Sequence, residues 1–178
     1  MRLSILILGL ILAACAAPQQ RERTTMALTP ADASTALAAG ERLSVERTTY
    51  QAPAGQDPLV ELAIRHSDGR RMTFQAANHA PHNVMAQAPG GALAQIMGLF
   101  GDEAPALYAS HAPEGSGAPF ICPPHGPLLI GYYEAPDGAV QIVGLKQNIQ
   151  FETRPDGVAE AIPYSPDQVC ARLRFNRQ

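Results

Sequence analysis

The chain has 178 residues, with 13 Lys or Arg and 16 Asp or Glu, which gives a formal net charge of −3. This length fits one domain with its own hydrophobic core, and the mildly acidic balance argues against nucleic acid as a partner. Trp is absent and aromatic residues make up 6% of the chain, so aromatic platforms for stacking bases or sugars are scarce.

The first residues have the pattern of a secretory signal. Arg2 supplies a positive charge, and a short apolar run from Ile5 to Ala14 ends in small residues before Cys15. These three parts define a signal peptide. The run is shorter than the roughly 18 apolar residues that a membrane-spanning helix needs. We therefore predict that residues 1–14 are a signal peptide and that the protein is exported.

The last four residues of this segment, Leu12-Ala13-Ala14-Cys15, resemble the lipobox of bacterial lipoproteins. The resemblance covers residues 1–15 alone. It implies cleavage after Ala14, a diacylglycerol thioether on Cys15 and acylation of the new amine, such as by palmitate. Ala16 follows the cysteine, where an Asp would indicate retention at the inner membrane. The resemblance therefore implies a lipid anchor in the cell envelope, at the outer membrane and facing the periplasm.

After the anchor, residues 15–28 lack apolar periodicity, and we expect a flexible tether. The folded domain is expected over residues 29–178. It begins with a short helix, because Thr29 is a suitable N-cap, Pro30 suits the first helical position and Gly40 is a natural stop.

Three strands are predicted next. Alternation begins at Leu43 and continues to about Tyr50, and a second alternating run covers residues 59–66 with Val60, Leu62 and Ile64 on one face. The turn Ser67-Asp68-Gly69 leads to a return strand over residues 71–76, with Met72 and Phe74 directed inward.

The middle of the chain is predicted to contain an irregular segment, a helix and a long loop. Residues 78–89 are expected to be irregular, and Gly90-Gly91 opens a helix with an apolar stripe that packs on the sheet or serves as a docking surface. This stripe consists of Leu93, Ile96, Met97 and Phe100. Residues 104–127 are rich in Pro and Gly, which predicts a long loop.

The C-terminal part carries two Pro-Asp-Gly turns, at residues 136–138 and 155–157. They separate alternating runs at 128–134, 139–152 and 158–162, which predicts a three-stranded antiparallel meander. Gly144 indicates a bend or bulge in the long middle strand. The final segment fits a strand through Val169, Ala171 and Leu173, but the capping box at residues 165–168 favours a helix.

Three cysteines are present. With Cys15 assigned to lipid, Cys122 and Cys170 are left in an oxidising compartment and are expected to form a disulfide. The alternative is a reactive thiol at Cys122 beside His125, which could serve a cysteine hydrolase or a metal site.

One histidine-rich segment is a candidate metal site. His79 and His82 lie three residues apart with Met85 nearby, and such ligands suit copper or zinc. Further ligands would have to come from His66, His111 or His125. Pro81 prevents a regular helix from aligning the pair, so we expect a solvated or hydrogen-bonded loop here, with metal binding as the alternative.

Together these features predict an α+β fold in one domain: an antiparallel sheet of about five to seven strands with two or three short helices. No local catalytic motif is found in the sequence. We therefore expect a non-catalytic, lipid-anchored accessory or assembly component with an envelope protein partner and no cofactor besides the covalent lipid. A periplasmic copper or zinc lipoprotein is the first alternative. A small hydrolase with a cryptic site near Cys122, His125 and Tyr132 is the second.

Overall fold

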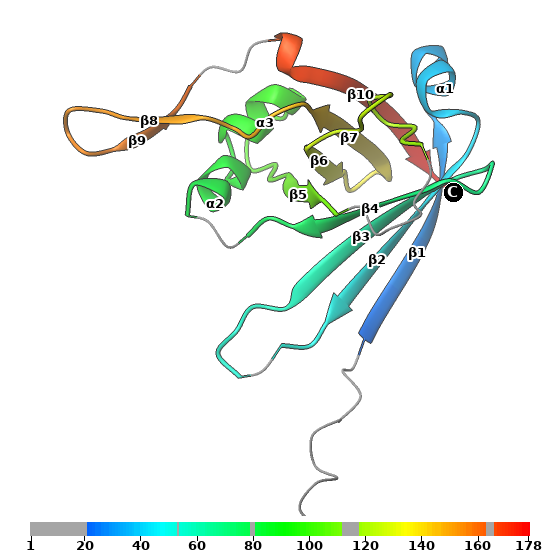
Figure 1. Ribbon diagram of the computed structural model, residues 1–178, viewed down its shortest axis with the longest axis horizontal. Coiled ribbons are helices and arrows are strands. Elements are labelled where there is room, and N and C mark those ends of the chain that lie inside the picture. The colour runs from blue at the N-terminus through cyan, green and yellow to red at the C-terminus, as the bar shows by residue number, and fades with distance from the viewer. Residues whose placement is uncertain (1–20, 53, 79–80, 112–117, 163–165) are drawn as a thin grey trace, which may run out of the picture.

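The computed structural model describes residues 21–178 except 53, 79–80, 112–117 and 163–165. Eight antiparallel strands of this described part form a closed barrel in the order β1-β10-β7-β6-β5-β4-β3-β2 (Figure 1). The strands are β1 (Arg21–Pro30), β2 (Leu43–Tyr50), β3 (Leu59–His66), β4 (Arg71–Ala76), β5 (Ala106–Ser110), β6 (Leu129–Glu134), β7 (Ala139–Leu145) and β10 (Val169–Arg177).

The prediction of an open α+β sheet with five to seven strands is therefore wrong, because the fold is mostly β and closed. Two barrel strands were not anticipated, and a third, β10, was only the alternative to a favoured helix. β1 occupies residues 21–28 of the segment predicted as a tether, β5 lies inside the predicted loop 104–127, and β10 replaces the predicted C-terminal helix. Closure follows from these strands, because β1 pairs with β10 through Leu28↔Arg177, Thr29↔Asn176 and Pro30↔Phe175.

The barrel is filled by its own side chains. Along each strand alternate residues point inward, so Leu62 and Ile64 of β3 face the interior together with Met72 and Phe74 of β4, as predicted. Each such buried side chain contributes about 1.5–3 kcal/mol to stability. The largest fully buried side chains of this interior are Leu28, Leu62, Ile64, Phe74, Ile121, Ile130, Tyr132, Ile142 and Phe175.

A second hydrophobic cluster lies on the outside of the barrel, against β5, β6 and β7. It is covered by α2 (Pro81–Gln87) and α3 (Ala92–Met97), and its buried side chains include Leu93 and Met97. α3 packs closely on β6 because Gly131 has no side chain; a Cβ atom there would lie 2.7 Å from Leu93 Cδ1. The apolar stripe predicted on this helix therefore packs on the sheet, except that Phe100 lies beyond α3 and is exposed.

The structure corrects two local predictions about helices. The first helix, α1 (Ala33–Ala39), ends at Gly40 as expected, but its N-cap is Asp32, whose carboxylate accepts a hydrogen bond from the Thr35 amide at 2.7 Å. Pro30 belongs to β1. The segment 78–89, predicted to be irregular, contains α2, and its Pro81 occupies the first helical position, where a missing amide costs nothing.

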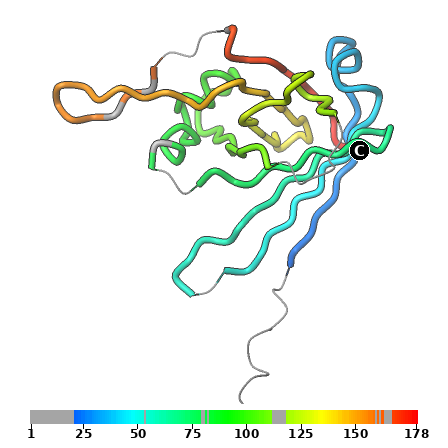
Figure 2. Tube along the Cα trace, viewed as in Figure 1, coloured from blue at the N-terminus to red at the C-terminus, as the bar shows by residue number. Residues whose placement is uncertain are grey.

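The predicted meander is also wrong beyond its first two strands. β6 and β7 pair as expected, but the long middle strand divides after Leu145, and its second part forms β8 (Phe151–Thr153). β8 pairs only with β9 (Ala159–Ala161), in a hairpin that projects from the barrel (Figure 2). A single turn of 3-10 helix, η1 (Pro166–Gln168), is followed directly by β10, where a longer helix was predicted; Ser165 of the predicted capping box lies outside the described residues.

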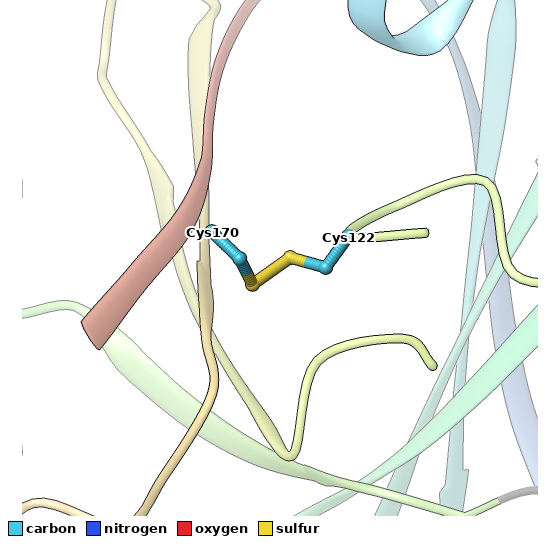
Figure 3. The surroundings of a disulfide bond; sticks show 2 residues. All are labelled: Cys122 and Cys170. Atoms are coloured by element: carbon cyan, nitrogen blue, oxygen red, sulfur yellow. A yellow bond between two sulfur atoms is a disulfide. The ribbon is translucent and has the colours of Figure 1, made fainter. Parts of the chain in front are cut away.

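The disulfide between Cys122 and Cys170 is present, with 5.3 Å between the two Cα atoms (Figure 3). It joins the segment 118–127 to the start of β10, and Phe120 and Ile121 of this segment are buried in the barrel interior. Gly144 faces the bond, since a Cβ atom there would lie 2.5 Å from Cys122 Sγ. The register shift predicted near Gly144 occurs in the neighbouring strand, between Val169 and Ala171.

Candidate binding site at the barrel mouth

A group of polar side chains gathers inside one end of the barrel. We call this end the mouth: it is the end where β1 and β3 begin and where β2 and β6 finish. Arg47 of β2 and Glu134 of β6 both occupy inward positions and meet across the interior, with 3.2 Å between Arg47 Nη2 and Glu134 Oε1. Tyr132, two residues before Glu134, donates a hydrogen bond from its hydroxyl to Glu134 Oε1 at 2.6 Å.

Aromatic rings and a thioether surround this pair. The ring of Tyr108 meets that of Tyr132 edge-on, with centroids 6.3 Å apart, and the Arg47 guanidinium lies 5.6 Å from the centroid of the Tyr132 ring. Met26 Sδ lies 3.5 Å from the Tyr132 hydroxyl. We name Met26, Arg47, Tyr108, Tyr132 and Glu134 the mouth cluster.

The surroundings of the mouth cluster raise the pKa values of both of its phenols. Burial raises the pKa of Tyr132 far above that of free tyrosine, and the hydrogen bond to Glu134 and its negative charge act in the same direction. Burial also raises the pKa of Tyr108, although the positive charge of Arg47 opposes this shift. Both phenols therefore remain protonated hydrogen-bond donors at neutral pH, and neither serves as a nucleophile or a general base.

The cluster is accessible and incompletely satisfied. The side chains of Arg47 and Glu134 are 37% and 29% exposed, so solvent and small molecules reach the ion pair. Arg47 Nε, by contrast, is buried and has no hydrogen-bond partner among the described residues. A buried donor without a partner costs free energy that a suitable acceptor could recover.

A groove lies beside the start of β3, at the same end of the barrel as the mouth cluster. Its volume is about 530 Å³, within the range of about 300–1,000 Å³ that is typical of small-molecule sites. Val60 links the two features, because it lines the groove and also packs against the barrel interior. The groove is lined by Asp57, Pro58, Val60, Asn78, Val84, Gln87 and Ala88.

The predicted cysteine site has a structural role. Cys122 is bonded to Cys170, so it offers no thiol nucleophile. Cys122 lies near the junction of β7 and β10 at the end of the barrel opposite the mouth, whereas Tyr132 belongs to the mouth cluster. Tyr132 is therefore not brought to Cys122, although His125 lies in the same turn as Cys122, closed by a hydrogen bond from the Gly126 amide to the Cys122 carbonyl at 2.8 Å.

The predicted metal ligands are only partly within the described structure. His79 and the side chain of His82 lie outside the described residues, and Met85 on α2 is half exposed. His66 packs between Phe120, 5.3 Å away by ring centroids, and Asp68, 2.9 Å from its Nδ1. No group of three His, Cys, Asp or Glu side chains among the described residues is arranged to hold a metal ion. The copper or zinc hypothesis stays a prediction.

Sequence reasoning missed Arg47 and Glu134, although a signal was available. Arg47 follows Leu43 and Val45 on the same face of a predicted strand, and Glu134 follows Ile130 and Tyr132 in the same way. A charged residue at an inward-facing position, where the pattern predicts an apolar residue, marks a functional or paired position.

The lipidation residue Cys15 lies outside the described residues. Within the part of the chain that the structure describes, no helix has the length and apolar character needed to cross a membrane. Comparisons with known proteins found no matching family model, no matching curated protein and no matching solved structure.

Proposed function

We propose that this protein is a non-catalytic lipoprotein of the cell envelope that binds a small ligand at the mouth of its barrel. Acyl groups on Cys15 hold it at the outer membrane, where the barrel faces the periplasm. Two or three acyl chains exceed what stable membrane attachment requires, at about 0.8 kcal/mol for each buried methylene group. In this location it acts as an accessory component for an envelope protein partner.

The mouth cluster carries the proposal. A barrel of eight strands is just wide enough for its own side chains or for one small ligand. Here apolar side chains fill the interior, and the Arg47–Glu134 pair with its two phenols stands at one accessible end beside a groove. Fixed donors and acceptors next to apolar surface are the usual composition of a ligand site. The fold by itself does not assign a function, so the site residues supply the functional argument.

The anchor is tested by mass spectrometry of the mature amino terminus from native membranes. We expect a terminal Cys15 peptide that carries the mass of the diacylglycerol group and an amide-linked acyl chain. Cys15→Ala should release the protein from the membrane fraction. An unmodified Cys15 in the mature protein would contradict the anchor and leave the mouth cluster to be tested separately.

The ligand site is tested by native mass spectrometry of the protein extracted gently from its own membranes. We expect a co-purifying small molecule, and we expect Arg47→Gln to lose it. Arg71→Gln is a matched control, because Arg71 also pairs with a glutamate, Glu61 at 3.3 Å, but lies on the outer face of the barrel. Absence of any bound molecule on the wild-type protein, or equal loss in both variants, would contradict the proposal.

A further inference from the structure

The membrane anchor enters the structure at the mouth. Strand pairing places Arg21, Tyr50 and Leu59 side by side across β1, β2 and β3. Since adjacent strands are about 4.8 Å apart, Arg21 lies roughly 10 Å from Leu59. The start of the described chain is therefore close to the start of β3, where the groove begins with Pro58 and Val60.

The segment before β1 is short. Cys15 and Arg21 are six residues apart in the sequence, so even a fully extended chain spans about 20 Å between them. Acyl groups on Cys15 would thus keep Arg21 within that distance of the bilayer surface, with the start of β3 roughly 10 Å from Arg21. The opposite end of the barrel, with α1 and the disulfide, would point away from the membrane.

Apolar residues make up most of the groove lining, and two exposed apolar residues, Leu59 and Met85, are sequence neighbours of lining residues. Val84 and Met85 of α2 are 54% and 47% exposed, and Leu59 is 37% exposed at the start of β3. Pro58, Val60, Val84 and Ala88 supply apolar groove walls, with Asp57, Asn78 and Gln87 as the polar lining residues. Exposed apolar side chains that gather beside a groove mark a place where an apolar ligand or surface is bound.

We propose that this groove holds one acyl chain of a phospholipid from the membrane to which the protein is anchored. The inference rests on the membrane anchor of the proposed function, and it concerns the groove, which is lined by other residues than the mouth cluster. The chain enters between the start of β3 and α2, covers Val60 and Val84, and leaves the head group at the polar rim. A hydrocarbon chain gains about 25 cal/mol for each Å² of apolar surface removed from water, so a groove of this size can hold it without a charged contact.

The proposal is first tested in the native membrane with the full-length protein. A photo-reactive benzophenone amino acid replaces Val84 in the groove or, as the control, Leu37, which is 91% exposed on α1 away from the mouth. After irradiation, mass spectrometry should find phospholipid attached at position 84 and none at position 37. Attachment at position 84 to this protein's own amino-terminal acyl groups, or phospholipid attachment at both positions, would overturn it.

A second experiment tests the groove in protein that has no membrane anchor. Mature protein carrying Cys15→Ala, which cannot be acylated, is titrated calorimetrically with palmitoyl lysophosphatidylcholine below its micelle concentration. We expect saturable binding, weakened roughly tenfold or more by Ala88→Phe, which fills the groove, and by Val84→Asn, which makes its exposed wall polar. Ala38→Phe on α1 is the matched control and should bind as the unaltered protein does.

These two arms separate the failure of the groove from the failure of the anchor. If fractionation shows that the protein does not reside in the membrane while the lysolipid still binds, the anchor is wrong and the acyl-chain site holds. If the protein is membrane-bound but the lysolipid does not bind, or binds equally to Ala88→Phe and Val84→Asn, the acyl-chain site is wrong. Circular dichroism confirms that each variant is folded before it is compared.

Discussion

Gly144 leaves space for the two sulfur atoms of the disulfide. The sequence predicted a bend there, and the structure shows a close approach of the disulfide instead. A Cβ atom at this position would lie 2.5 Å from Cys122 Sγ and 3.2 Å from Cys170 Sγ. Both sulfur atoms are fixed by their bond to one another, so neither can move aside as the end of a flexible side chain would.

We predict that Gly144→Ala lowers the free energy of unfolding by about 1–3 kcal/mol, the usual cost of forcing an extra carbon into packed surroundings. Urea denaturation of the oxidised protein measures this cost. The same substitution in a Cys122→Ala/Cys170→Ala background should cost less, because the sulfur atoms that obstruct the new carbon are gone. An equal cost in both backgrounds would mean that the disulfide is not what requires glycine.

The mouth cluster predicts a delayed ionisation of tyrosine. The pKa values of Tyr108 and Tyr132 are raised in the folded state, principally by burial, whereas an unfolded tyrosine ionises near pH 10. The folded state therefore holds these protons more tightly than the unfolded state. This contribution to stability is fully present below about pH 10 and is lost as the pH rises toward the folded-state values.

An alkaline titration followed by tyrosinate absorbance measures this effect. We expect part of the absorbance change to be delayed beyond pH 10 while the protein is folded and to appear at once on unfolding. Tyr132→Phe should reduce the delayed part. A single transition near pH 10 that includes all the tyrosines of the folded protein would contradict the geometry of the mouth cluster.

At the scale of elements, alternation predicted the strands that have one apolar face and one polar face. β2, β3 and β4 were predicted over the residues where they occur, with Met72 and Phe74 inward. β1 was missed because most of its length extends beyond the closed barrel: residues 21–27 pair with β2, while β10 pairs with residues 28–30. A strand that buries so few side chains has little apolar pattern to detect.

The other errors also have physical causes. β5 is only five residues long and is flanked by Pro and Gly, so its composition resembles a loop. The alternation at 139–152 is real, since Val143, Leu145, Ile149 and Phe151 all belong to the outer hydrophobic cluster, but it does not show that the strand divides. Continued burial on one face is compatible with one strand or with two, because both can pack against the same helices.

The seam between β1 and β10 has few paired residues, and Leu28 and Phe175 are fully buried in it. We predict that Leu28→Ala lowers the free energy of unfolding by about 2–5 kcal/mol, because it removes a fully buried side chain and leaves a cavity. Leu37→Ala is the matched control, since Leu37 is exposed on α1, and it should change stability by less than about 0.5 kcal/mol. Chemical denaturation compares the two, and equal effects would refute the role of the seam.

At the scale of the whole molecule, closure could not be predicted from local patterns. It depends on a pairing between the first strand and the last, such as Leu28 with Arg177, and on the tilt and stagger that a barrel requires. Alternation shows which face of a strand is buried but not which strand lies beside it. The mouth cluster depends on the same closure, because Arg47 and Glu134 meet only when β2 and β6 face one another across the interior.

The two ends of the barrel are built differently, and this leads to the last prediction. The disulfide closes a loop of 48 residues and joins the segment 118–127 to β10 at the end opposite the mouth. Restriction of the unfolded chain by a loop of this size is worth about 4 kcal/mol. Cys122→Ala/Cys170→Ala should therefore lower the free energy of unfolding by about 2–4 kcal/mol, allowing for packing that adapts to the smaller side chains.

The mouth should be insensitive to this loss as long as the protein is folded. Its side chains come from β1, β2, β5 and β6, and the contacts that join them are made among the cluster's own residues, without Cys122 or Cys170, in the described part of the chain. The delayed tyrosine titration and the lysolipid affinity should both persist in Cys122→Ala/Cys170→Ala under conditions where circular dichroism shows a folded barrel. If either disappears while the barrel is intact, the disulfide controls the mouth across the length of the interior, and the two ends are coupled rather than independent.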